Sequence, residues 1–278
     1  MRWSMATGIV VAFAGLANAA MAAPSAEIVD AAARVTVIPE ARSDVAVFLV
    51  KANTRLPIWI SRNGDKFVIR GNVGHQVTSC GSWGGHPSVG IWLRGRFAYQ
   101  DLPQIVIRTP LDAHVSAGDA VFGSIGHARN VEIGNHGCGD WTVGDVDGQL
   151  KVALAGSGDL RAASAGSAAI DIVGSGDVST GAIHQGLGAS IAGSGDLTAA
   201  SITGPMRVRV SGSGDVKVAS GHVSTMTVSV AGSGDVHFGG VAGALEASVS
   251  GSGDVTVAQV TGPVVKHVAG SGDVTVGR

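Results

Sequence analysis

Short runs in which apolar and polar residues alternate fill the C-terminal part of the chain, from residue 111 to 278. A turn of small residues follows each run and often contains glycine, as at Gly204 and Gly262. Alternation with a period of two is typical of strands that bury one face, and these runs are too short and too rich in β-branched residues for helices. Examples are Val255-Thr256-Val257, Val274-Thr275-Val276 and the set Met206, Val208 and Val210.

A motif of Gly-Ser-Gly-Asp followed by Val or Leu repeats along the same stretch. It occurs seven times, and two degenerate copies, 137–140 and 116–119, precede the first full copy. Successive aspartates lie 18 to 21 residues apart, and a period this regular indicates stacked repeats. The aspartates of the full copies and of the nearer degenerate copy are Asp140, Asp159, Asp177, Asp196, Asp215, Asp235, Asp254 and Asp273.

Each repeat therefore predicts two short strands and two turns. About 19 residues at about 3.3 Å each give a perimeter of about 60 Å, which is one coil of a β-solenoid whose coils stack in parallel about 4.8 Å apart. Parallel crossover connections strongly favour right-handed winding. We predict an all-β fold, a right-handed parallel β-helix over residues 111–278, in which the motif glycines supply positive φ or close backbone approach at a corner.

The aspartates would form one row along the corners, where neighbouring carboxylates about 5 Å apart repel by about 1 kcal/mol even in water. Two arrangements would offset this repulsion. Each side chain accepts hydrogen bonds from turn amides, as in an Asx turn, or the row binds cations such as calcium. Calcium-binding solenoids carry a glycine-rich nonapeptide, whereas the period here is about 19, so we favour the hydrogen-bonded arrangement and predict no cofactor.

The repeated Gly-Ser-Gly-Asp-Val/Leu unit resembles the auto-transporter adhesin, head-GIN-domain family, and so do the stretches 35–40 and 101–110. The resemblance covers about Ala32 to Arg278. It implies an exported parallel β-helix with an adhesin-like role, and it brings no catalytic residues. Cys138 in the serine position of the motif and Ala117 in the earliest copy depart from the family pattern, so the first coils match least well.

The N-terminal 110 residues lack the motif and divide into two parts. Residues 1–22 have the features of a secretory signal peptide: Arg2, an apolar run from Ile9 to Leu16, and small residues for cleavage. No second hydrophobic span follows, so we expect an exported protein of the periplasm or cell surface without a transmembrane segment. Residues 23–110 predict a β-rich cap over the first coil, with strands near 34–38, 45–51, 57–62, 66–70, 89–94 and 104–109 and a hairpin turn at Asn63-Gly64.

The two cysteines, Cys80 and Cys138, form an even pair in a chain expected to be exported, which predicts a disulfide. The bridge would tie the cap to the first well-formed corner. Closing a loop of about 58 residues constrains the unfolded chain by about 4 kcal/mol on the entropic model. His75 and His136 lie nearby in sequence, but their spacing does not fit a zinc site, so we predict no metal.

Nearly all aromatic residues of the mature chain lie in the cap or at its junction with the coils, and after Trp141 only Phe238 follows. Recognition of carbohydrates or peptides draws on aromatic surfaces, so we expect a recognition site in this part of the chain, with Trp83 and Trp92 as candidates. The alternative is that these aromatic side chains fill the core of the cap.

The net charge and the short loops disfavour two classes of function, nucleic-acid binding and catalysis. A formal net charge of −2 gives no indication of a nucleic-acid partner. The coils run almost without insertions, whereas an enzyme needs longer loops to wall a cleft, so we predict a non-enzymatic protein. The leading hypothesis is an adhesin-like protein with an unknown glycan or protein ligand at the surface or in the envelope. A periplasmic scaffold without an external ligand is the alternative, and a polysaccharide-active enzyme is least favoured.

The open edge of the last coil raises a further question. Lys266 takes a position that Val208 has in an earlier coil. A charge there would protect the edge from pairing, or the edge would serve end-to-end self-association. The sequence leaves both open.

Overall fold

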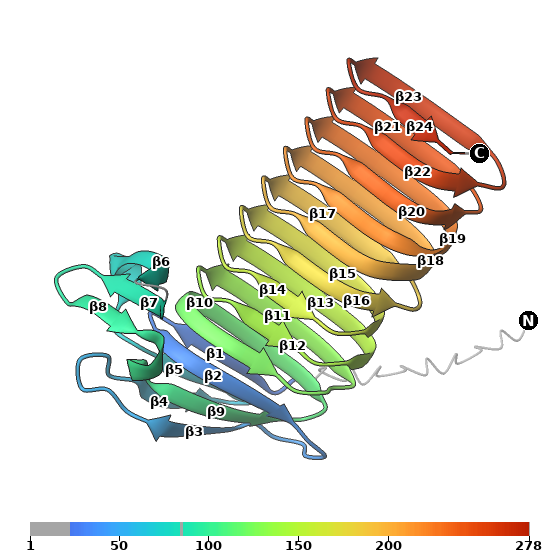
Figure 1. Cartoon of the computed structure of the whole chain (residues 1–278). Coiled ribbons are helices and arrows are strands. Elements are labelled where there is room, and N and C mark those ends of the chain that lie inside the picture. Colours follow the sequence, from blue (N-terminus) through green and yellow to red (C-terminus); the bar gives the residue numbers. More distant parts are fainter. Residues whose placement is uncertain (1–22, 84–85, 278) are drawn as a thin grey trace, which may run out of the picture.

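The computed structural model of the protein describes residues 23–83 and 86–277, and the predicted signal peptide lies outside them. The chain forms one elongated stack of parallel coils with a smaller β-sheet near its N-terminal end (Figure 1). Within the described residues the only helical elements are two 3-10 turns, η1 (Gly74–Gln76) and η2 (Tyr99–Asp101). The prediction of an all-β parallel solenoid is confirmed, while the hand of its winding stays a prediction.

Two parallel ladders form the opposite walls of the solenoid, and the long strands β10 (Asp112–Ile125), β18 (Leu197–Gly212) and β19 (Val216–Gly232) contribute to both. The first wall also contains β11 (Asn130–Gly137), β13 (Val146–Gly156), β15 (Ala165–Gly174), β17 (Leu187–Gly193), β21 (Leu245–Gly251) and β23 (Val264–Gly270). The second wall also contains β12 (Trp141–Val143), β14 (Leu160–Ala162), β16 (Val178–Ile183), β20 (Val236–Ala242), β22 (Val255–Val260) and β24 (Val274–Val276).

The ladder register places equivalent residues of successive coils above one another, so one apolar position becomes a continuous buried row. The row Ile172, Ile191, Val210, Val230 and Val249 is an example, and each member is at most 2% exposed. Rows of this kind from the two walls meet in a narrow core, and burying each such side chain contributes about 1.5–3 kcal/mol. The alternating positions point outward and are mostly polar or small, with Val173 as an apolar exception.

The glycines of the motif are required by the way the corners stack. Gly212, the first glycine of its copy, has φ of 135°, and a Cβ there would lie 2.2 Å from the carbonyl oxygen of Gly193 in the preceding coil. At Gly214, the second glycine, a Cβ would lie 2.2 Å from the oxygen of Gly195 and 3.0 Å from Ile191. Only glycine fits both positions at this separation of the coils, which explains why the motif repeats.

The N-terminal section supplies further layers of the same stack. Strands β1 (Ser25–Val29) and β2 (Ala32–Pro39) form a coil that pairs with β10 on one side. On the other side they pair with β5 (Lys66–Arg70) and β9 (Gln104–Thr109). The antiparallel strands β3 (Ala46–Lys51) and β4 (Trp59–Asn63) end the stack. The division at residue 110 stays a prediction, since parallel pairing continues across it.

The hairpin predicted at Asn63-Gly64 joins β4 to β5. Asn63 pairs with Lys66, and Gly64 between them has φ of 62°. The two turn residues are Gly64 and Asp65, and Asn63 belongs to β4, so the turn lies one residue further along the chain than the predicted Asn63-Gly64 turn. Gly64 adopts its left-handed conformation at no steric cost.

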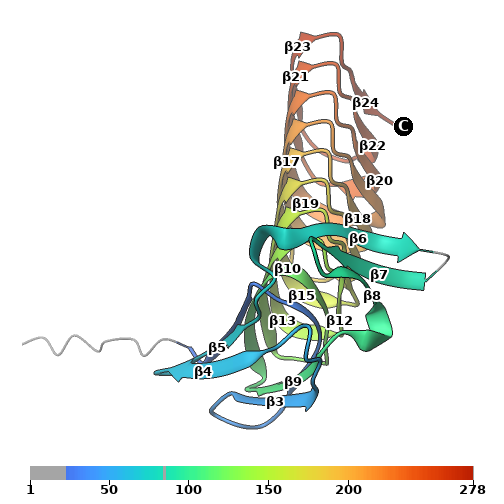
Figure 2. The same ribbon diagram turned by 90° about the vertical axis from the view of Figure 1, so that its left-hand side faces the viewer.

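A separate antiparallel sheet lies beside the solenoid (Figure 2) and consists of β6 (Val77–Trp83), β7 (His86–Ile91) and β8 (Gly95–Ala98). Its buried side chains, among them Val89, Ile91 and Phe97, pack with Leu102 in a second small core. The run 89–94, predicted as one strand, ends as a strand at Ile91 because a turn follows.

Lys266 closes the core at the last coil. Its place in the ladder follows Val208, Val228 and Ala247, so it takes an inward position. Its Nζ donates a hydrogen bond to the carbonyl oxygen of Val274 on the opposite wall. An inward charge of this kind would make the outer edge of β23 a poor template for another strand, and both interpretations of Lys266 stay predictions.

Candidate functional site

The corner aspartates form a hydrogen-bonded ladder along the solenoid. From Asp140 to Asp254, the Oδ1 of each accepts a hydrogen bond from the backbone N–H of the next aspartate in the row, at 2.8–3.1 Å. The donor therefore belongs to the neighbouring coil and not, as in an Asx turn, to the aspartate's own turn. The Oδ1 of Asp273 instead accepts from the N–H of Val274 at 2.7 Å. A charge-assisted bond of this length offsets the repulsion between neighbouring carboxylates.

The ladder does not by itself make a metal centre. Among the residues that the structure describes, no three His, Cys, Asp or Glu side chains come together as ligands for one ion. The corner aspartates are mostly exposed and run in a single file of identical environments. Their demonstrated contacts are structural, holding one coil to the next.

Cys80 and Cys138 form a disulfide, with 5.8 Å between their Cα atoms. Cys80 lies in β6, and Cys138 takes the serine position of the degenerate motif that follows β11. The bridge therefore ties the small sheet to the corner of an early coil. At this corner the buried Asn135 donates from Nδ2 to the carbonyl oxygen of Gly139 at 2.7 Å.

The aromatic residues divide between core and surface. Trp141, Phe97 and Phe238 are buried, so for them the packing interpretation holds. Trp92 is 63% exposed and lies in the turn between β7 and β8, where it is accessible to a ligand. Trp83 ends β6, and its side chain lies outside the part of the structure that is described.

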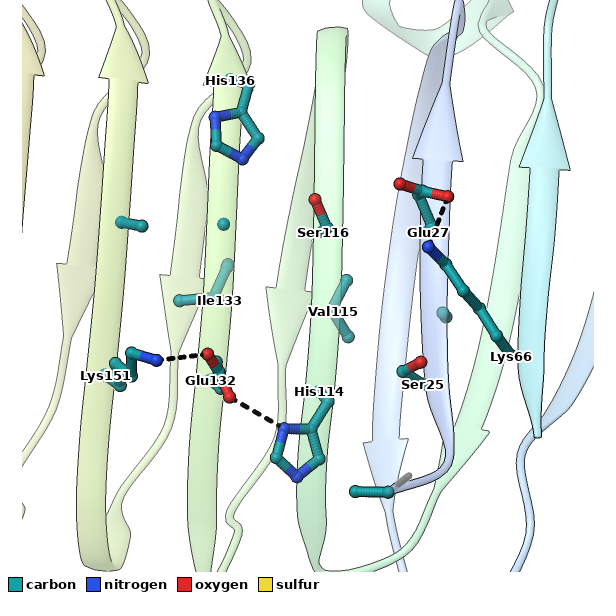
Figure 3. A pocket seen from close by; sticks show the side chains of 14 residues that line it. Ser25, Glu27, Lys66, His114, Val115, Ser116, Glu132, Ile133, His136 and Lys151 are labelled. Carbon is teal, nitrogen blue, oxygen red and sulfur yellow. Dashed lines mark hydrogen bonds and ion pairs between the residues drawn. The ribbon is translucent and has the colours of Figure 1, made fainter. Parts of the chain in front are cut away.

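A shallow groove crosses the outer face of the first wall where the N-terminal layers meet the repeats (Figure 3). The ladder places Glu27, Ser116, Gly134 and Ala153 in one outward row over β1, β10, β11 and β13. Between Glu27 and Asp171, the next member of the row on β15, this row has only small residues, so it forms a low floor there. Ser116, Gly134 and Ala153 all line the groove.

Charged and polar side chains stand on both sides of this floor. The neighbouring outward row contains His114, Glu132 and Lys151, and His136 lies on the opposite side above Gly134 (Figure 3). A Cβ on Gly134 would come within 3.0 Å of the His136 Nε2, so the absence of a side chain at 134 leaves the space that the ring borders.

Glu132 is the centre of a fixed polar network at the rim. Its Oε1 accepts a hydrogen bond from the Lys151 Nζ at 2.6 Å, and its Oε2 lies 3.2 Å from the His114 Nδ1. The hydrogen bond from Lys151 is the main reason that the pKa of Glu132 is lowered from its ordinary value, and the same contact raises the pKa of Lys151. At the end of the floor, Lys66 and Glu27 form an ion pair at 2.7 Å.

The groove has hydrogen-bond donors and acceptors around a floor of residues with small side chains or none. Carboxylate, ammonium and imidazole groups hold one another in place, which preorganises them for a polar ligand. The arrangement suits recognition of several hydroxyl or amide groups by matched donors and acceptors.

Sequence reasoning did not find this groove. Aligning the coils would have put His114, Glu132 and Lys151 in one row, because they are spaced by about one coil. Glu27 and Lys66 could not be placed this way, since nothing in the sequence says that β1 lies between β5 and β10.

Comparisons with known proteins found a family match for the C-terminal coils and a structural similarity over most of the chain. Residues 181–277 match a family model described as "Putative auto-transporter adhesin, head GIN domain". A crystal structure described as a "Putative lipid binding protein" from Parabacteroides distasonis is similar to this chain over 92% of both chains, with 14% sequence identity and a TM-score of 0.40. No curated protein matches the chain. Residues 181–277 are thus similar to the head-GIN-domain adhesin family that the Gly-Ser-Gly-Asp repeats resemble.

Proposed function

We propose that this protein is an exported, non-enzymatic, adhesin-like binding protein, and that the groove at the junction of the N-terminal layers and the repeats holds its ligand. The family match supports the adhesin-like role. The main observation in favour of a ligand site in the groove is the hydrogen-bonded network of Glu132 beside a floor of small residues.

The ligand that best fits this groove is a hydroxyl-rich glycan of the cell surface or envelope. Glu132 supplies acceptors, Lys151 supplies donors, and His114 and His136 supply ring nitrogens on either side of the floor. The floor of Ser116, Gly134 and Ala153 lets a sugar ring approach the strands closely. Because the pKa of Glu132 is lowered, chiefly by the hydrogen bond from Lys151, its carboxylate stays ionised at and above its ordinary titration range and remains available as an acceptor.

A glycan array probed with the purified full-length mature protein tests this proposal. Glu132→Gln removes the charge at the centre of the network, and Ala153→Leu fills the floor without touching the core. Both should reduce binding at least about tenfold, the usual effect of losing one charged partner or the access to a site. Glu246→Gln is a matched control, since Glu246 lies in the same outward row on β21, outside the groove.

Two results would contradict the proposal. If no glycan binds, or if both groove variants bind as the wild-type protein does, the groove is not the ligand site. Protease accessibility of the tagged protein in intact cells tests the exported location. Digestion only after the outer envelope is permeabilised would favour the periplasmic scaffold over an adhesin-like protein.

A further inference from the structure

The turn between β7 and β8 contains a residue that its backbone does not favour. The N–H of Arg94 donates to the carbonyl oxygen of Ile91 at 3.1 Å, which closes a four-residue turn. Leu93, the third residue of this turn, has φ of 59°. Glycine or asparagine is usual in that position, because a larger side chain at positive φ crowds the backbone. A leucine at 93 therefore costs stability in the turn.

Burial of the side chain does not offset this cost. Leu93 is 91% exposed and the adjacent Trp92 is 63% exposed, so the two apolar side chains stand together in solvent. The leucine thus stabilises neither the turn conformation nor the core of the small sheet. Strained residues that the rest of the structure tolerates are concentrated at functional sites.

The turn is also held firmly in place. The Trp92 N–H donates to the carbonyl oxygen of Gln76 at 2.8 Å. The guanidinium of Arg94 donates to both the Oδ1 and the carbonyl oxygen of Asn72, at 2.5 and 2.8 Å. The carbonyl oxygen of Arg55 accepts a further bond from Arg94 at 3.2 Å. These contacts fix the position of the exposed pair, which lowers the entropy lost on docking.

The surroundings of the turn are basic. Arg94 lies in the turn and Arg96 follows it, whereas Lys66 and Arg70 pair with Glu27 and Asp30. Over 23–110 there are ten Lys or Arg against six Asp or Glu, which gives +4, whereas over 111–278 there are eight against fifteen, which gives −7. The turn therefore lies at the positive end of a polar molecule, and a negatively charged partner is attracted to that end.

We propose that the Trp92–Leu93 turn docks on the surface of a lipid bilayer with anionic headgroups. Tryptophan partitions to the boundary between headgroups and acyl chains, where its ring is buried and its N–H stays hydrated. Leu93 reaches into the apolar layer beside it, and the basic residues of this end lie near the lipid phosphates. The turn holds the solenoid to a membrane surface from outside, and this inference does not rest on the groove.

Flotation of the full-length mature protein with lipid vesicles tests the proposal. The wild-type protein should float with vesicles that mix phosphatidylglycerol and phosphatidylcholine, and it should float less with phosphatidylcholine alone or at high salt. Leu93→Gly removes the apolar side chain and also relieves the positive φ, so this variant should fold at least as stably as the wild type. It should bind the mixed vesicles about tenfold more weakly, and Trp92→Ala should show a comparable loss.

A control variant separates this site from general stickiness. Val173→Ser changes an apolar side chain that is 57% exposed on β15, far along the chain from the turn, and it should leave vesicle binding unchanged. The proposal is overturned if the wild-type protein does not float with the anionic vesicles, or if Leu93→Gly binds them as well as the wild type. A lower melting temperature for Leu93→Gly would overturn the strain argument on which the proposal rests.

Discussion

Replacing one corner aspartate by asparagine separates the two effects of its carboxylate, acceptor and charge. Asp215 is suitable because it lies in the middle of the ladder. Its Oδ1 accepts the N–H of Asp235 at 2.8 Å, and its own N–H donates to the Oδ1 of Asp196 at 2.8 Å. Asp215→Asn keeps an oxygen acceptor and removes the charge, whereas Asp215→Ala removes both.

The repulsion between carboxylates lowers the free energy of unfolding, and the hydrogen bond to the charged acceptor raises it. Two neighbouring carboxylates about 4.8 Å away repel Asp215 by about 1.7 kcal/mol together in water, and screening at physiological salt reduces this to about 1 kcal/mol. A hydrogen bond to a charged acceptor contributes about 1.5–3 kcal/mol, about 1 kcal/mol more than a neutral one. Asp215→Asn should therefore change the free energy of unfolding by less than about 0.5 kcal/mol at physiological salt. Asp215→Ala loses the bond and gains only the relief of repulsion, so it should destabilise by about 1 kcal/mol.

Urea unfolding at low salt and at about 1 M salt measures both effects, because the Debye length falls to about 3 Å at 1 M. The wild-type protein should gain more stability from salt than Asp215→Asn does. If asparagine destabilises as much as alanine, the charge matters and the acceptor does not, and the hydrogen-bond reasoning fails. If calcium stabilises the wild type and not the asparagine variant, the row binds cations.

Three further changes test other parts of the structure. Lys266→Val removes the bond to Val274 and leaves an apolar end, so sedimentation velocity should show association that grows with concentration; a strictly monomeric variant would contradict the protective role of the lysine. Gly195→Ala places a Cβ 2.2 Å from a carbonyl oxygen of the preceding coil, and thermal unfolding should show a loss of about 3 kcal/mol or more, whereas a loss under about 1 kcal/mol would mean that the coils can separate there. Reduction of the Cys80–Cys138 bridge should lower the free energy of unfolding by up to about 4 kcal/mol in urea, and an unchanged midpoint would show that the unfolded chain is not constrained by it.

The architecture of the repeats could be predicted because each coil uses the same local chemistry. Alternating valines define the strand faces. The two motif positions require glycine, because a Cβ there would clash with the carbonyl oxygen of the preceding coil, as at Gly214. A constant period of about 19 residues then fixes which side chains stack, so the core rows and the aspartate row follow from the sequence. The cysteine pair was predictable for a simpler reason, since two cysteines allow one intramolecular bridge.

The order of the N-terminal layers was decided by the tertiary structure alone. Strands β1 and β2 lie between β10 and the pair β5 and β9, although β5 and β9 follow them in the chain. No short-range pattern encodes this insertion, because it depends on which ladder edges remain unpaired once the coils have stacked. The groove depends on it, since Glu27 and Lys66 line the same groove as His114 only because of that order. The sequence determined the repeating coil because its contacts recur at a fixed separation along the chain, whereas contacts between distant and dissimilar segments exist only in the folded molecule.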